Sequence, residues 1–134
     1  MNYWLVKSDP DTYGWDELIK DETTRWDGVR SYAARNHLKG MKKGDRVLFY
    51  HSQINPSVVG IAKVVKGNYP DPTTEEDGWV CVDISADKAL KKPVTLPQIK
   101  SDKRLKNMLL LKIGRLSVMP VTKDEFDAIV ELGK

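Results

Sequence analysis

Apolar and polar residues alternate along several short segments of the chain, and this pattern predicts a protein richer in strands than in helices. Apolar runs at residues 3–7, 47–50 and 57–69 predict strands, and Gly60 within the third marks a bulge or a close backbone approach. The segment WVCVDIS alternates cleanly, which places Val80, Val82 and Ile84 on one strand face. Those three residues are the better candidates for the core.

Helices are predicted where a capping residue precedes an amphipathic stretch. Ser31 is a plausible N-cap for a helix at residues 32–39, and Thr122 with Glu125 forms a capping box ahead of a C-terminal helix. Two shorter helices are predicted over the segments WDELIK and LPQIK. The segment MLLLKIGRLSVMPV stays open between one bent strand and a strand, a loop and a second strand.

The order of these elements indicates the fold class. About four to six short strands and several short helices, without regular strand-helix alternation, favour an α+β fold on a small curled sheet. A closed or nearly closed barrel would remove exposed strand edges, although the pattern does not decide closure. No repeat and no linker-like segment interrupts residues 1–134, so one domain is expected.

Composition excludes several classes of protein. With Cys81 alone, the chain forms no internal disulfide, which fits a reducing compartment. Charged residues follow the first few apolar residues, so neither a signal peptide nor a membrane span is predicted. We therefore expect a cytoplasmic protein with no membrane association.

Candidates for catalysis or metal binding are weak. His51 and Ser52 are adjacent on a predicted strand and point to opposite faces, so they do not form a nucleophile and its base. Cys81 lacks a cationic neighbour in the sequence that would lower its pKa, and His37 and His51 have no carboxylates at metal-ligand spacing. No phosphate-cradling glycine loop occurs. A non-enzymatic protein without a cofactor or metal is expected.

Basic residues are concentrated in one segment, although the formal net charge is only +3. Such clustering matters more for phosphate contact than the total charge, and an ordinary solvated surface is the alternative interpretation of the same charges. The candidate phosphate contacts are Arg25, Arg35, Lys39, Lys42, Lys43 and Arg46.

Aromatic residues suggest a binding function. Four Trp and five Tyr are more large amphipathic rings than a core of this size demands. Trp4 and Trp15 read as structural, whereas Trp26 stands beside an Asp27-Gly28 turn in a loop context. An indole in a positively edged cleft can grip a nucleobase, and composition alone leaves Trp26 balanced between core and ligand platform.

Seven motifs in order identify a family resemblance. They are YWLVKSDPDTYGWDEL, WDGVRSYAARNHL, MKKGDRVLFYHS, VVGIAKVV, YPDPT, PVTLPQIK and GRLSVMPVTKDEF. In this order they resemble the EVE domain family of the PUA-like superfamily, which also holds the YTH and ASCH domains. The resemblance implies a pseudobarrel, with a small mixed and curled sheet of about five to six strands flanked by short helices. It also implies a cleft for a single nucleotide.

The resemblance further implies which residues form the pocket. Trp26 would stack on the base, while Asn36 and Ser52 could pair with base-edge groups and Arg115 and Lys7 could meet phosphate or a carbonyl. The remaining implied pocket residues are Ser8, Arg30, Tyr32, Tyr50, His51, Leu116 and Ser117. The loop after YPDPT is shorter than is typical of the family, so the pocket is expected to be more open or differently selective.

The expected partner is nucleic acid. EVE domains are regarded as readers of modified bases, so the resemblance implies that a flipped modified cytosine in DNA is the favoured target. An RNA-binding module, an enzyme acting on a nucleotide, and an interaction scaffold with core aromatics remain alternatives. A monomer is expected, and any associated nuclease or modification activity would belong to a separate protein.

Overall fold

The computed structural model describes residues 1–134 and has an α+β architecture built on one mixed sheet. The strand order is β2-β5-β4-β3-β1-β6. Only β1 and β3 run parallel; the other neighbours are antiparallel. The sheet is open, with β2 and β6 at its edges. The strands are β1 (Tyr3–Ser8), β2 (Thr23–Trp26), β3 (Arg46–His51), β4 (Ser57–Pro70), β5 (Val80–Thr95) and β6 (Val118–Val121).

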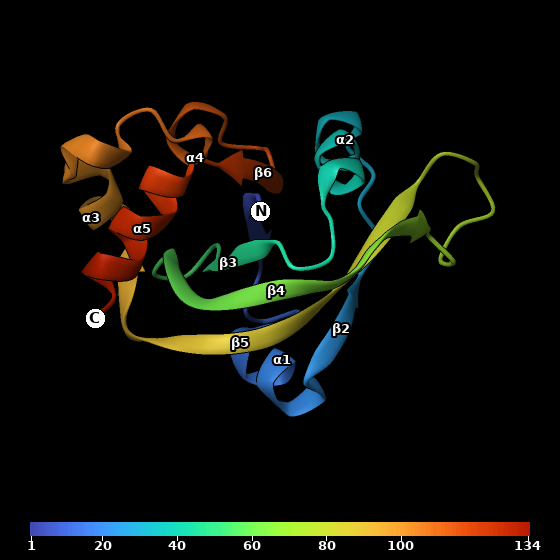
Figure 1. Ribbon diagram of the computed structural model, residues 1–134, viewed down its shortest axis with the longest axis horizontal. Helices are drawn as coiled ribbons and strands as arrows, with labels where there is room; N and C mark the ends of the chain where they lie inside the picture. Colours follow the sequence, from blue (N-terminus) through green and yellow to red (C-terminus); the bar gives the residue numbers. More distant parts are fainter.

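Short helices cover the sheet at different places. Figure 1 shows α3, α4 and α5 together at one end of the molecule, with α1 and α2 on opposite sides of the sheet. The loop of the long β4–β5 hairpin projects at the end opposite α3. The helices are α1 (Trp15–Asp21), α2 (Tyr32–Gly40), α3 (Leu96–Ser101), α4 (Leu109–Lys112) and α5 (Lys123–Leu132), with a 3-10 turn, η1, at Lys103–Leu105.

The predicted capping residues begin their helices. The Ser31 hydroxyl accepts a hydrogen bond from the Ala34 N–H at the start of α2. At α5 the Thr122 hydroxyl accepts from the Glu125 N–H at 3.0 Å, and the Glu125 carboxylate accepts from the Thr122 N–H at 2.9 Å. These contacts satisfy N–H groups that have no partner within the helix.

The core lies along the sheet and confirms the predicted strand faces. Val80, Val82 and Ile84 are buried, as are the structural residues Trp4 and Trp15. The β4–β5 pairing shifts at Gly60, where the Trp15 indole occupies the space that a Cβ would need. Gly60 is therefore both the predicted bulge and the predicted close approach.

Three elements differ from the prediction. Residues 109–112 form α4 rather than a strand, because leucine is also a strong helix former and only Leu110 needs burial. Residues 23–26 form the edge strand β2 rather than a loop, and pairing with β5 supplies the hydrogen bonds that their short pattern does not reveal. β5 continues to Thr95 through polar residues, since its pairing with β4 does not require an apolar face there.

Candidate functional site

Trp26 ends β2 and lies half-buried beside a small cavity. Its ring meets Tyr13 and Phe49 edge to face, with centroid distances of 6.4 Å and 5.6 Å. The cavity has a volume of about 190 Å³ and is lined by Ser8, Tyr13, Thr24, Arg25, Trp26 and Asp27. Trp26 thus packs against the core and borders an open space at the same time. An indole, three hydroxyl groups and a cation suit a flat polar ring.

The turn that follows Trp26 is held by a buried carboxylate. Asp71 accepts hydrogen bonds from the Gly28 N–H and the Arg30 guanidinium, both at 2.9 Å. It also accepts from the Thr73 N–H at 2.8 Å and the Thr73 hydroxyl at 2.6 Å. Burial raises the pKa of Asp71, but these donors outweigh burial and hold it well below its usual value. Gly28 has a φ of 74°, which favours glycine at this turn.

Ser8 and His51 end the parallel strands β1 and β3 on the side where Trp26 lies. They are paired in register, and Phe49, two residues before His51, contacts both His51 and Trp26. The Ser8 hydroxyl donates to the Tyr13 carbonyl at 2.5 Å. His51 Nε2 accepts from the Trp15 N–H at 3.0 Å, and burial lowers the His51 pKa. This hydrogen bond requires a neutral imidazole.

Lys7 and Tyr50 form the pair that precedes Ser8 and His51 in the β1–β3 register. Their side chains therefore point to the face of the sheet opposite to that of Ser8 and His51. The Lys7 ammonium donates to the Gly114 carbonyl at 2.9 Å, and burial lowers its pKa. Tyr50 is buried, and burial raises its pKa. The structure therefore separates the expected pocket residues, because neighbours on an extended strand point in opposite directions.

The segment before β6 lies beside the end of β1. The Lys7 N–H donates to the Ser117 carbonyl at 2.9 Å, and Leu116 is buried. Arg115 is exposed and forms no ion pair. The Ser52 N–H donates to the Ser8 carbonyl at 2.9 Å, so Ser52 does border the group around Ser8.

Arg30, which precedes α2, and Tyr32 and Arg35 of α2 gather around a different aromatic residue, Trp79. Tyr32 stacks on Trp79 with ring centroids 5.3 Å apart and an interplanar angle of 25°. The guanidinium carbons of Arg30 and Arg35 lie 5.6 Å and 5.3 Å from the Trp79 centroid. Asn36 is exposed on the same helix. None of these α2 residues lines the Trp26 cavity.

The candidate phosphate contacts divide into paired and unpaired cations. Arg25 pairs with Asp27 at 2.7 Å, and Arg46 pairs with Asp87. The remaining members form no ion pair: Arg35, Lys39, Lys42 and Lys43. Those four leave positive charge uncompensated, so they are the better candidates for a polyanion.

The sequence interpretation missed four residues near these sites. Tyr13 and Thr24 line the Trp26 cavity, Asp71 holds the turn, and Trp79 stacks on Tyr32. Tyr13 and Asp71 stand within the quoted motifs, so the motifs contained a signal for them. Thr24 and Trp79 lie outside the quoted motifs, and only tertiary contacts reveal their positions.

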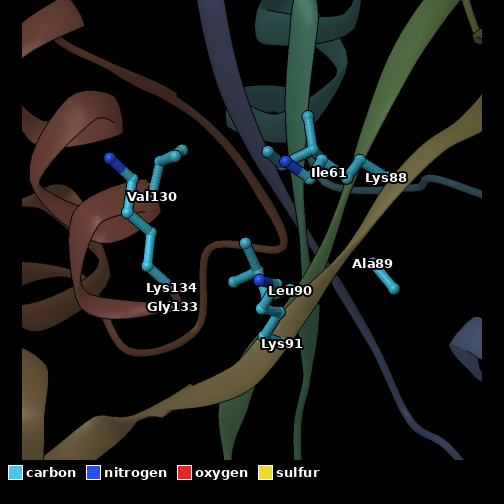
Figure 2. Close-up of a pocket in the computed structure, with 8 residues that line it drawn as sticks. All are labelled: Ile61, Lys88, Ala89, Leu90, Lys91, Val130, Gly133 and Lys134. Carbon is cyan, nitrogen blue, oxygen red and sulfur yellow. The ribbon is translucent and has the colours of Figure 1, made fainter.

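A second cavity lies away from all of the expected residues. It has a volume of about 270 Å³ between β5 and the end of α5, with Leu90 and Val130 among its lining residues (Figure 2). Lys88, Lys91 and Lys134 border it, but no aromatic ring does. The Trp26 cavity therefore offers the better platform for stacking.

Metal-ligating side chains, the single thiol and the helices bear on other kinds of function. No three His, Cys, Asp or Glu side chains are grouped so that they could hold a metal ion. Cys81 is buried, and burial raises the pKa of its thiol. None of the helices has the length and apolar character that crossing a bilayer requires.

Comparisons with known proteins agree with the motif order. The model of the EVE domain matches residues 2–132. Human thymocyte nuclear protein 1 is 34% identical over 165 aligned positions, which cover 98% of this chain and 73% of that protein. The alignment is longer than this chain, so the human protein carries insertions relative to it.

Solved structures show the same architecture. Protein Rpa0253 of Rhodopseudomonas palustris has a TM-score of 0.95 at 44% identity, covering 99% of this chain and 93% of that chain. The human THYN1 protein in complex with 5-methylcytosine-containing DNA has a TM-score of 0.91 at 34% identity, covering 100% and 98%. The Zymomonas mobilis protein ZmASCH, at a TM-score of 0.61, 13% identity and full coverage of both chains, shares the fold alone.

These relatives correct one expectation. The human, rat and mouse proteins are all named as nuclear proteins, which contradicts the expected cytoplasmic location. The expectation of no signal peptide and no disulfide fits nuclear proteins as well as cytoplasmic ones, so it did not justify choosing between the two locations.

Proposed function

Because this chain belongs to the EVE domain family, we propose that it is a non-enzymatic reader that holds one extruded, modified base against Trp26. The cavity beside the half-buried indole carries this proposal. At about 190 Å³ it is smaller than pockets for drug-sized ligands, which start near about 300 Å³, and it suits a single base. The complex of the THYN1 protein with 5-methylcytosine-containing DNA supports modified cytosine in DNA as the favoured target.

The energetics of such a pocket require contacts beyond the base. Stacking on one aromatic ring contributes about 1–3 kcal/mol per base. Extruding a paired base costs a few kcal/mol, so the stack and a few hydrogen bonds roughly offset that cost. Thr24 and Arg25 are among the cavity residues whose side chains can donate to the edge of a base, whereas the Ser8 hydroxyl donates to the Tyr13 carbonyl and can accept.

Net affinity then depends on phosphate contacts. Arg35, Lys39, Lys42 and Lys43 have no carboxylate partner, so they are free to neutralise phosphates. Binding through such contacts releases counterions and weakens as salt rises. A methyl group that fills the cavity adds about 1–3 kcal/mol of discrimination, so selectivity for the modified base is modest.

The proposal is tested by titrating labelled oligonucleotides of one sequence. The set contains DNA with one cytosine, DNA with one 5-methylcytosine, and the corresponding RNA. Trp26→Leu should weaken binding of the modified DNA about tenfold, because the stacking surface is lost. Tyr3→Leu is the matched control, since Tyr3 is also a half-buried ring, but it packs on Phe126.

The outcomes test both the location of the base site and the preference for DNA over RNA. Equal loss in Trp26→Leu and Tyr3→Leu, with both proteins folded by circular dichroism, would exclude the Trp26 cavity as the base site. Tighter binding of the RNA than of either DNA would replace the DNA reader with the RNA-binding alternative, because the sugar hydroxyl alone distinguishes the backbones.

A further inference from the structure

Tyr32 and Trp79 form an exposed aromatic stack outside the Trp26 cavity. Tyr32 is the first residue of α2 and is 68% exposed, whereas Trp79 directly precedes β5 and is half-buried. Neither ring packs against the hydrophobic core, although Trp26 does. The stack therefore adds little to the core, and another role must be sought for it.

The position of Arg35 leaves the outer face of Tyr32 open. The Arg35 guanidinium carbon lies 4.8 Å from the Tyr32 centroid and 5.3 Å from the Trp79 centroid, while the two rings are 5.3 Å apart. If Arg35 covered the outer face of Tyr32, it would be about twice as far from Trp79. It lies instead at the side of the stack, which agrees with the high exposure of Tyr32.

Charges of both signs border the stack. The Trp79 indole N–H donates to the Glu76 carboxylate at 3.1 Å, whereas the cations of α2 are unpaired. Arg35 forms no ion pair, and its buried Nε has no hydrogen-bond partner. Lys39, one helical turn later, is also unpaired, and α2 contains no acidic residue. An open aromatic face edged by unpaired cations is the combination that binds single-stranded nucleic acid.

The stack and the cavity are joined by the same short segments. Trp26 pairs with Val82 on β5, and Trp79 precedes Val82 by three residues, a distance of roughly 10 Å along a strand. This odd spacing places Trp79 on the opposite face from Val82, so a nucleic-acid strand in contact with both rings passes around the sheet edge formed by β2. Asp71 ties the turn after Trp26 to Arg30, which lies over Trp79. Successive phosphates of one DNA strand advance about 3.4 Å, so this distance corresponds to a few nucleotides.

From this arrangement we infer that Tyr32, Trp79 and Arg35 form a second nucleic-acid contact, which stacks an unpaired base flanking the base held at Trp26. The flanking base lies on the outer face of Tyr32, Trp79 supports the inner face, and Arg35 meets the adjacent phosphate. Because stacking tolerates every base, this contact contributes affinity rather than sequence preference. The inference rests on the proposed function, which supplies the base at Trp26.

The test uses a single-stranded DNA nonamer with one central 5-methylcytosine, and a second nonamer whose flanking nucleotides are abasic. Tyr32→Ala should weaken binding of the first nonamer about tenfold and leave binding of the second unchanged. The loss of affinity caused by the substitution and the loss caused by the abasic flanks therefore do not add. Arg35→Gln should reduce the slope of log affinity against log salt by about 0.7, the value for one phosphate of a single strand. Ile19→Ala, an exposed residue on α1, is the control.

The outcomes separate this inference from the proposed function. Normal binding by Tyr32→Ala, or losses that add, would overturn the second contact and leave the surface to a protein partner. If Trp26→Leu still weakened binding in that case, the base pocket would stand alone. The reverse pattern would overturn the pocket and keep the stack, and failure of the wild-type protein to bind either nonamer would overturn both.

Discussion

Replacing Asp71 with asparagine is expected to destabilise the protein and loosen the turn that follows Trp26. The carboxylate is fully buried and accepts four hydrogen bonds. Oδ2 accepts from Gly28 and Arg30, and Oδ1 accepts from Thr73. An asparagine amide presents one oxygen and one nitrogen, so either pair of donors loses its acceptor.

The size of the effect follows from those contacts. Each hydrogen bond to a charged group contributes about 1.5–3 kcal/mol, and two are lost. The Arg30 side chain is 38% exposed and can turn to water, which recovers part of the loss. We therefore expect the free energy of unfolding to fall by about 2–4 kcal/mol, which lowers the urea midpoint by about 1–2 M.

The effect of pH supplies an independent check. Because the folded pKa of Asp71 lies well below its ordinary value of 3.8, the stabilisation by this carboxylate is fully present above pH 3.8. The stabilisation is lost as the pH falls through the folded pKa. The difference between wild type and Asp71→Asn should therefore stay constant from neutral pH down to about pH 4 and narrow below it.

Urea unfolding followed by tryptophan fluorescence at pH 7 and pH 3 measures both quantities. Asp27→Asn is the matched control, since Asp27 pairs with Arg25 at the surface and such pairs contribute little. Equal losses in the two variants, or a difference that persists unchanged at pH 3, would refute the role assigned to the Asp71 carboxylate.

Two further predictions concern the packing behind the site. Gly60→Ala should lower the free energy of unfolding by about 1–3 kcal/mol in chemical denaturation, because the new Cβ collides with the buried Trp15 indole. Gly114→Ala is the control, because its new Cβ meets open space, and it should not show this loss of stability; an equal loss in both variants would contradict the collision. His51 accepts from the Trp15 N–H only when neutral, and its folded pKa is lowered below 6.5, so its stabilisation is present above pH 6.5 and is lost on acidification. His51→Gln, which keeps an acceptor, should show a smaller fall in melting temperature between pH 7 and pH 5; an unchanged fall would contradict this reasoning.

Local structure was predictable where the signal lay within a few residues. Ser31 and Thr122 began their helices as predicted, because a cap satisfies N–H groups only two or three residues away. Val80, Val82 and Ile84 were assigned to the core from alternation alone. The order of the motifs was sufficient to identify the EVE domain family.

The sequence by itself therefore determined the class of fold and the family, because caps, alternation and motif order are local properties of the chain. Only the tertiary structure decided which residues meet. The β1–β3 register sets Ser8 beside His51, and Arg30 finds its acceptor in Asp71, 41 residues away. Tyr32 lies against Trp79 rather than Trp26. Such contacts depend on strand register and on side-chain direction across paired elements, which no short stretch of sequence contains.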